Sequence, residues 1–318
     1  MRKSQLNRIG QNIRAKHKPI AAVRSDNLPL AVGTIILTVL ALSLGDALIK
    51  LTSGNFVIWQ IFVIRSAIAI PCLLIYMAIS SRASLRIPNS LSWTIVRSLL
   101  LVLMWVGYYI SLPHMSLSAA AAAYYTLPIF ITLFSAVIVG DTVSRTGWIA
   151  VFLGFSGVVL ILKPSVEDFN WYTILPLLAA ILYALAMILT RTKCRSEPPL
   201  LLSLALNISF VVVGGVTAAF IATLPNEVRQ GFLLAPWAAM GPSQWLSMSL
   251  LAVAILIGSI GAAIAYQNGP SSVIGIFDFA YVGFAVLWSV LIFAEIPDIV
   301  SVAGMVLIVI AGVMSLRQ

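Results

Sequence analysis

Three charged residues near the start of the chain, Asp46, Lys50 and Arg65, stand in sequence that is otherwise strongly apolar. A charge inside a lipid-embedded helix is costly unless it is paired or faces water, so such residues usually serve a function. Asp46 and Lys50 are four positions apart, which places them on one helix face where they can pair. Arg65 follows on the next apolar segment and offers Asp46 a second partner. The set either locks two helices together or lines a cavity that meets a charged or zwitterionic solute, and the sequence leaves both interpretations open.

A second pair of charges is expected nearer the opposite membrane face. Asp278 follows a turn at 268–270 by about seven residues, and Arg97 lies about six residues into its own apolar segment. At the rise of an α-helix both side chains fall at a depth of roughly 10 Å, so we expect an inner charge pair. The alternatives are that Arg97 extends to the interface and that Asp278 faces a wet cavity alone. Either Asp46 or Asp278 could carry a proton during transport, so a proton or another coupling ion is an expected partner.

Aromatic side chains accompany these charges. The aromatic candidates for cavity lining are Trp59, Tyr108, Tyr124, Tyr125 and Tyr183. Aromatic walls with a few polar groups suit an organic solute, and they suit a cationic group through contact with the ring face. Packing between helices and a place at the membrane interface explain any single one of them as well.

The composition indicates a polytopic membrane protein. Hydrophobic residues make up 61% of the 318 positions and charged residues only 9%, which is too little polar surface to cover a soluble domain. No basic patch with interleaved aromatics suggests nucleic-acid binding, so we expect none. The two cysteines, Cys72 and Cys194, form no metal or disulfide pattern. We therefore expect neither a metal nor a cofactor, and membrane lipids as the surroundings.

Apolar stretches near spanning length recur along the chain and predict an all-α fold of ten transmembrane helices. They cover about 30–51, 56–79, 91–112, 116–140, 146–162, 171–190, 199–224, 245–267, 271–294 and 298–316. Pro71, Pro128 and Pro176 fall inside these stretches and are expected to kink or break helices, which membrane bundles tolerate.

The basic residues set the expected orientation. With residues 1–29 taken as a basic cytoplasmic tail, 14 of the 19 lysines and arginines fall on the cytoplasmic side. An even number of helices returns the C-terminus to that side. The tail has no apolar core of its own, so we do not expect a cleaved signal peptide; it is either disordered or an amphipathic surface helix. We expect a multi-pass protein of the inner (cytoplasmic) membrane with both termini in the cytoplasm.

The two halves of the chain resemble each other. Residues 118–162 and 272–316 share a small-residue helix, an acid at its end and a final helix with glycines, and Asp141 aligns with Glu295 at an offset of 154. Because each half has five helices, the halves are inverted relative to each other, as in many secondary transporters. The expected division is a first repeat at 30–162, an external linker at 163–170 and a second repeat at 171–316.

The order of short motifs resembles the drug/metabolite transporter (DMT) superfamily, EamA type, over nearly all of residues 30–316. The motifs in the first half are Gly45-Asp46-Ala47, Lys50, Trp59-Gln60, Arg65, Arg97-Ser98-Leu99, Tyr108-Tyr109, Pro113, Ser116 to Ala121, Tyr125, Pro128, Gly140-Asp141, Gly154 and Gly157, and those in the second half are Tyr183-Ala184, Arg191, Glu295, Gly304 and Gly312. Asp141 departs from the glutamate that the family often has. The resemblance implies a permease with a central cavity for a small-molecule metabolite. Uptake of an S-adenosylmethionine- or riboflavin-like solute and export of amino acids or other metabolites both stay open.

Enzymatic readings find little support in the sequence. The two histidines, His17 and His114, have no metal-ligating neighbours at useful spacing, and no phosphate-binding glycine loop is present. Asp46 and Asp278 as a catalytic acid pair would lie toward opposite faces. A transporter is therefore favoured over a membrane enzyme or a non-transporting scaffold, and the oligomeric state is left open.

Overall fold

A computed structural model describes residues 26–52, 56–80, 87–111, 114, 123–163, 171–293 and 298–316. Within these ranges every regular element is a helix. Eight helices are long and apolar enough to cross a membrane, and two shorter apolar helices, Leu127–Val139 and Ile299–Ser315, accompany them. The expectation of an all-helical, multi-pass membrane protein is confirmed. Residues 1–25 of the basic tail, Glu295 and most of the expected linker lie outside the described residues.

Most helix bounds follow the apolar stretches to within a few residues; the start of the stretch expected at 116–140 lies outside the described residues, and α6 begins at Leu127. In chain order the helices are α2 (Leu28–Thr52), α3 (Ile58–Ser80), α4 (Leu91–Ser111), α6 (Leu127–Phe134) with a π-helical end η3 (Ser135–Val139), α7 (Arg145–Leu162), a 3₁₀ turn η5 (Trp171–Thr173), α8 (Ile174–Thr192), α9 (Pro199–Ala222), α10 (Gly231–Leu234), α11 (Pro242–Asn268), α12 (Ser271–Phe277), α13 (Ala280–Phe293) and α14 (Ile299–Ser315).

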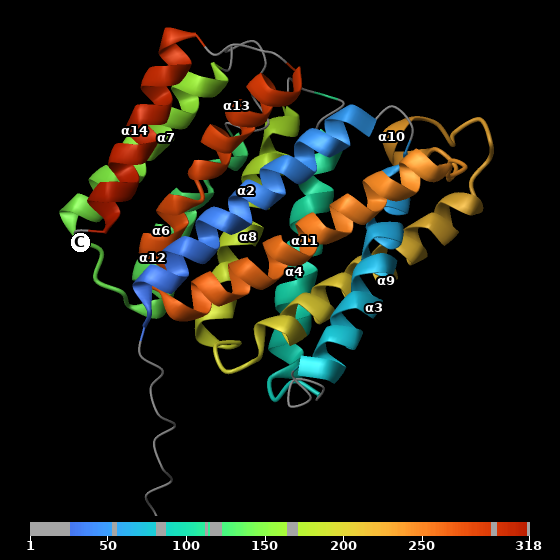
Figure 1. Cartoon of the computed structure of the whole chain (residues 1–318), viewed down its shortest axis with the longest axis horizontal. Coiled ribbons are helices and arrows are strands. Elements are labelled where there is room, and N and C mark those ends of the chain that lie inside the picture. Colours follow the sequence, from blue (N-terminus) through green and yellow to red (C-terminus); the bar gives the residue numbers. More distant parts are fainter. Residues whose placement is uncertain are drawn as a thin grey trace, which may run out of the picture.

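The bundle is built from helix pairs that come from opposite halves of the chain (Figure 1). Helices α7 and α14 lie side by side at one edge, and α3 packs against α9 toward the other. Between them α2 crosses α11, and α4 packs on α8. Because each pair joins the two halves, a cavity between the halves would be lined by helices from both.

Short turns interrupt the helical backbone at two places in the described residues. The chain enters α6 through a turn at 125–126, and a second turn at 278–279 separates α12 from α13. At both turns the backbone hydrogen bonds span three residues, as in Thr126 N–H to Ala123 O and Asp278 N–H to Gly275 O. Irregular backbone at membrane depth is tolerated where protein or water satisfies its polar groups. The sequence predicted a continuous ninth helix over 271–294, which is wrong at Asp278.

The three prolines act differently from one another. Pro128 stands in the first turn of α6, directly after the break, where its missing N–H costs nothing. Pro71 lies inside α3, which runs through it from Ile58 to Ser80, so it does not end this helix. Pro176 falls in the first turn of α8. Only Pro128 coincides with a break.

Glycines allow α7 and α14 to approach closely. A side chain at Gly157 would meet the Gly304 carbonyl oxygen at 2.6 Å, and one at Gly304 would meet the Gly157 oxygen at the same distance. Small residues at crossings permit this backbone contact in membranes, where dispersion contacts hold helices together. Lys163, which follows α7, pairs with Asp298, the N-cap of α14, so the two helices run antiparallel.

Candidate functional site

Asp46 lies partly buried on α2 and faces α13 of the second half. The Tyr281 hydroxyl donates a hydrogen bond to its carboxylate, and Trp288 donates through its indole nitrogen to Ser43, one turn earlier, at 2.9 Å. Arg65 lies within electrostatic reach of Asp46 but forms no ion pair with it. The expected Asp46–Arg65 pair is therefore wrong as a direct contact, and the side chain of Lys50 lies outside the described residues. Asp46 is held by a tyrosine from the second half of the chain instead.

Arg65 is enclosed by aromatic rings. Its guanidinium carbon lies 4.6 Å from the ring centre of Phe210, 5.1 Å from that of Phe62 and 6.0 Å from that of Trp105. The residue is only 4% exposed, and its Nε and one terminal nitrogen have no hydrogen-bond partner. Cation–ring contacts recover part of the cost of burying the charge. The unused N–H donors leave the group able to take an anion.

A continuous set of tyrosines, called here the tyrosine belt, runs from Asp46 to Asp278. Its members are Tyr108, Tyr109, Tyr124, Tyr125, Tyr183 and Tyr281, and neighbouring rings in it have centres 5.2 to 6.5 Å apart. The belt draws on α4, the turn before α6, α8 and α13. Tyr108, Tyr124 and Tyr281 keep part of their surface exposed. Tyr108 packs on Tyr124, and Tyr281 packs on Tyr125.

Asp278 sits at the break between α12 and α13 and is buried, with 4% of its surface exposed. Tyr266 donates a hydrogen bond to it at 2.5 Å, and Tyr183 contacts its other oxygen at 3.4 Å. Tyr183 was a predicted cavity residue, whereas the part played by Tyr266 was not foreseen. The helix break turns the carboxyl group toward the tyrosine belt and away from a regular helix face.

Arg97 does not pair with Asp278, contrary to the prediction. Its Nε donates to the Thr190 hydroxyl at 2.7 Å, and a terminal nitrogen lies 3.5 Å from the Leu202 carbonyl oxygen. The residue is fully buried, so it does not extend to the interface either. Arg97 ties α4 to α8 and α9, and its contacts are those of a structural residue.

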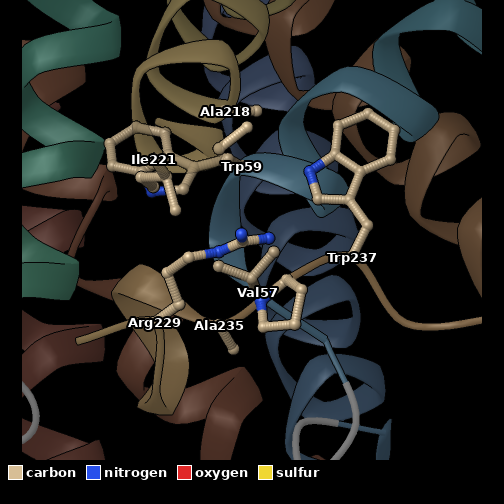
Figure 2. A pocket seen from close by; sticks show the side chains of 9 residues that line it. Val57, Trp59, Ala218, Ile221, Arg229, Ala235 and Trp237 are labelled. Carbon is tan, nitrogen blue, oxygen red and sulfur yellow. The ribbon is translucent and has the colours of Figure 1, made fainter. Parts of the chain in front are cut away.

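A pocket of about 250 Å³ opens where α3 begins and α9 ends. Figure 2 shows the Arg229 side chain reaching its centre, with the indoles of Trp59 and Trp237 on opposite sides. The Arg229 Nε is buried without a hydrogen-bond partner. Trp59 also meets Phe62 edge to face, with ring centres 6.0 Å apart, so it is a shared wall between this pocket and the rings around Arg65.

The segment 231–241 covers this end of the bundle. The Trp59 indole donates to the Leu233 carbonyl at 2.8 Å, and Gln60 exchanges two hydrogen bonds with the backbone of Ala238, at 2.8 and 2.9 Å. Phe232 of the same segment lies on Tyr109, with ring centres 5.9 Å apart. We call 231–241 the outer cover. It separates the aromatic site from the surroundings of that end.

The opposite end is closed by a charged cluster, called here the Asp26 latch. The Asp26 carboxylate accepts two hydrogen bonds from Arg191 at 2.7 Å each and a further one from Arg195. These bonds hold the pKa of Asp26 below its usual value. Arg195 donates to the Gln267 carbonyl at 3.1 Å, and the Gln267 side chain donates to the carbonyl of Cys194 at 2.8 Å. The latch thus joins the start of α2 to the ends of α8 and α11.

The predicted residues fall into one connected group with two exceptions. Asp46, Arg65, Trp59, Asp278 and the four predicted tyrosines line or adjoin the aromatic interior, while Arg97 lies apart and Lys50 cannot be placed. Phe62, Phe210, Trp105 and Tyr281 were missed. A signal for Tyr281 was available, since it follows Asp278 by three residues on the same apolar stretch. Within the described ranges no group of histidine, cysteine and acidic residues could hold a metal ion.

The family model of EamA-like transporters matches residues 29–163. The pseudopaline exporter of Pseudomonas aeruginosa is 26% identical over 290 residues, covering 89% of this chain and 96% of that protein. A riboflavin transporter of Rhizobium johnstonii is 31% identical over 150 residues, 42% of this chain and 49% of that one. An S-adenosylmethionine uptake transporter of Rickettsia conorii is 24% identical over 223 residues, 68% of each.

One solved structure superposes with a TM-score of 0.74 over 90% of this chain and 98% of its own, at 17% identity. At that identity the likeness concerns the fold alone. Together the named relatives indicate a membrane-embedded transporter with a small-molecule substrate.

Proposed function

We propose that this chain is an EamA-like transporter of the drug/metabolite transporter type and that it works as a secondary active transporter. It moves a small organic metabolite across the cytoplasmic membrane by alternating access through a central cavity between two five-helix repeats. The observation that carries the proposal is the site between the halves. Asp46 and Asp278 bond to tyrosines there, and the buried Arg65, within electrostatic reach of Asp46, has unpaired N–H donors.

The packing of the helices supports the inverted repeat. The helices α2, α3, α4, α6–η3 and α7 can be matched in order with α8, α9, α11, α12–α13 and α14. Exchanging each helix for its match then turns each of the four main helix–helix contacts either into another of them or into itself. The α2–α11 contact becomes α8–α4, and the contacts α3–α9 and α7–α14 map onto themselves.

Local features recur at the same offset as the sequence repeat. The side-chain N-caps of α7 and α14, Ser144 and Asp298, are 154 positions apart. The turns at 125–126 and 278–279 lie 153 positions apart, one fewer than that offset. Paired broken helices at the junction of inverted repeats are a recurrent form of substrate site. In this proposal residues 30–162 and 171–316 are the two repeats, joined by the external linker 163–170.

Alternating access requires that each end of the cavity open in turn. The outer cover closes one end through Trp59 and Gln60, and the Asp26 latch closes the other through Arg191 and Arg195. Following the distribution of basic residues, the latch end faces the cytoplasm together with both termini. The relatives include proteins named for export and for uptake, so the direction of transport is left to experiment.

A screen for thermal stabilisation of the purified protein tests this function. The compounds are amino acids, nucleosides, flavins, sulfonium compounds and carboxylate-rich chelators. A substrate should raise the melting temperature of the wild type, and this shift should be lost in both Asp46→Asn and Asp278→Asn. A stabilising compound whose effect survives in both variants would bind elsewhere and contradict the proposed site.

A further inference from the structure

The most unusual side chain inside the bundle is Arg65. A buried guanidinium normally has a carboxylate or several carbonyl oxygens as partners, because a charge removed from water without them costs several kcal/mol. Arg65 is 4% exposed, yet its Nε and one terminal nitrogen bond to nothing in the protein. The nearest acid, Asp46, is engaged by Tyr281. The charge therefore calls for a partner that comes from outside the chain.

The aromatic surroundings contact Arg65 without bonding its N–H donors. Phe62 and Phe210 lie against the guanidinium, with ring centres 5.1 and 4.6 Å from its central carbon. Its N–H donors lie in its own plane, as a fixed fork that matches a planar acceptor with two oxygens. The phenyl rings offer the guanidinium contact but no hydrogen-bond acceptor, so these donors are left for such an acceptor. The planar two-oxygen acceptor among common metabolite groups is the carboxylate.

The local charge balance favours a monoanion over a phosphate. Arg65 contributes one positive charge, and Asp46 places an opposite charge within electrostatic reach. A phosphate monoester carries nearly two negative charges at neutral pH and would leave an excess beside Asp46. A single carboxylate matches Arg65, and an amino group on the same solute would match Asp46.

The outer pocket carries charge of the same sign. Arg229 reaches its centre between Trp59 and Trp237 and also has a buried Nε without a partner (Figure 2). Trp59 forms a wall of this pocket and contacts Phe62, which packs on Arg65. A carboxylate approaching from this end would meet a guanidinium in the pocket and a second one behind Trp59.

We propose that the transported solute carries a carboxylate group and that Arg65 binds it, with Arg229 as the first contact on the way in. This inference rests on the proposed transport function and adds the substrate class to it. Asp46, Tyr281 and the tyrosine belt then surround the remainder of the solute. Binding of the solute carboxylate by Arg65 explains why a guanidinium is kept at membrane depth without a partner from the protein.

The test measures binding without requiring transport. Benzoate, benzamide and phenyl phosphate are titrated onto purified protein in nanodiscs, with melting temperature and tryptophan fluorescence as readouts, since Trp105 lies beside Arg65. Benzoate should stabilise the wild type saturably, while benzamide should have no effect and phenyl phosphate should bind at least tenfold more weakly. Arg65→Gln should abolish the benzoate response, and Arg65→Lys should weaken it about tenfold because the fork is lost.

Arg145→Gln is the matched control, because Arg145 is an exposed arginine at the start of α7 and its loss should leave the benzoate response unchanged. Monodisperse gel filtration of each variant shows that it is folded. A wild type without a saturable benzoate response, an equal response to benzamide, a tighter response to phenyl phosphate, or a full response in Arg65→Gln overturns the proposal. Benzoate binding by a protein that moves no solute would instead contradict the transport function and leave the carboxylate site standing.

Discussion

The Asp26 latch offers the sharpest test of how the bundle opens. Asp26→Asn keeps the shape of the side chain and removes its charge, so the two bonds from Arg191 and the one from Arg195 lose their charge-assisted character. If the latch holds its end closed, the variant should open there more often. The carboxyl group is 34% exposed and Arg191 only 12%, so the pair is intermediate between a surface and a buried ion pair.

The expected size follows from that intermediate position. Exposed ion pairs contribute about 0.2–1 kcal/mol, while hydrogen bonds to charged groups contribute about 1.5–3 kcal/mol. Allowing for solvent screening, about 1.4 kcal/mol is a reasonable value for the whole latch, which corresponds to about a tenfold change in the ratio of closed to open forms.

Cys194 is a built-in reporter for this opening. It is fully buried, its carbonyl is bonded to Gln267 of the latch network, and burial raises the pKa of its thiol, which makes it slow to react. In a Cys72→Ala background, maleimide should label Cys194 about ten times faster in Asp26→Asn than in the parent. Arg191→Gln should give a similar rate, and the double variant should add little to either. Equal labelling of parent and Asp26→Asn would refute the assignment of a closing role to these residues.

The remaining predictions concern pH, packing and the outer cover. Because Arg191 lowers the pKa of Asp26, the latch is intact above the ordinary carboxyl pKa of about 4 and is lost as pH falls through the lowered value. Hydrogen exchange of residues 26–31, corrected for its intrinsic rate, should therefore stay constant from pH 8 to 5 and rise below about pH 4. A rise near pH 6 would contradict the lowered pKa. Gly304→Val should destabilise the protein by about 1–3 kcal/mol in thermal or denaturant unfolding, because the new side chain meets the Gly157 carbonyl. Gly215→Ala, where a side chain would enter open space, should be neutral or stabilising. Equal effects of the two substitutions would count against the close crossing of α7 and α14. Trp59→Phe removes the bond to Leu233 and should increase proteolysis within 231–241, and Trp245→Phe, on an exposed helix position, should not.

Much of the fold followed from hydropathy alone. Helices in lipid must be long and apolar, so their bounds could be placed within a few residues, and the turn at 268–270 was found from Asn-Gly-Pro chemistry. The break at 278–279 was missed, because the stretch around it is apolar apart from Asp278 and contains no proline. It depends on Tyr266 and Tyr183, which satisfy Asp278 from other helices.

The charged residues were found, but their partners were not. Spacing along one helix indicates that Asp46 sits at membrane depth, yet its bond to Tyr281 depends on how α13 packs on α2. For Arg97 the matched depth with Asp278 suggested a pair, whereas rotation of α4 turns it toward Thr190 instead. Depth follows from counting residues, and direction around the helix follows only from the packed bundle.

Flux through the purified protein tests the central claim most directly. The protein is reconstituted into liposomes loaded with the unlabelled compound that stabilises it best, and uptake of the labelled compound is followed as counterflow. A saturable signal above that of protein-free liposomes is expected in the wild type, with loss in Asp46→Asn and Asp278→Asn and retention in Arg145→Gln. Absence of counterflow for every stabilising compound, or flux in both acid-to-amide variants equal to that of the wild type, would contradict a transporter whose cavity lies between the two halves.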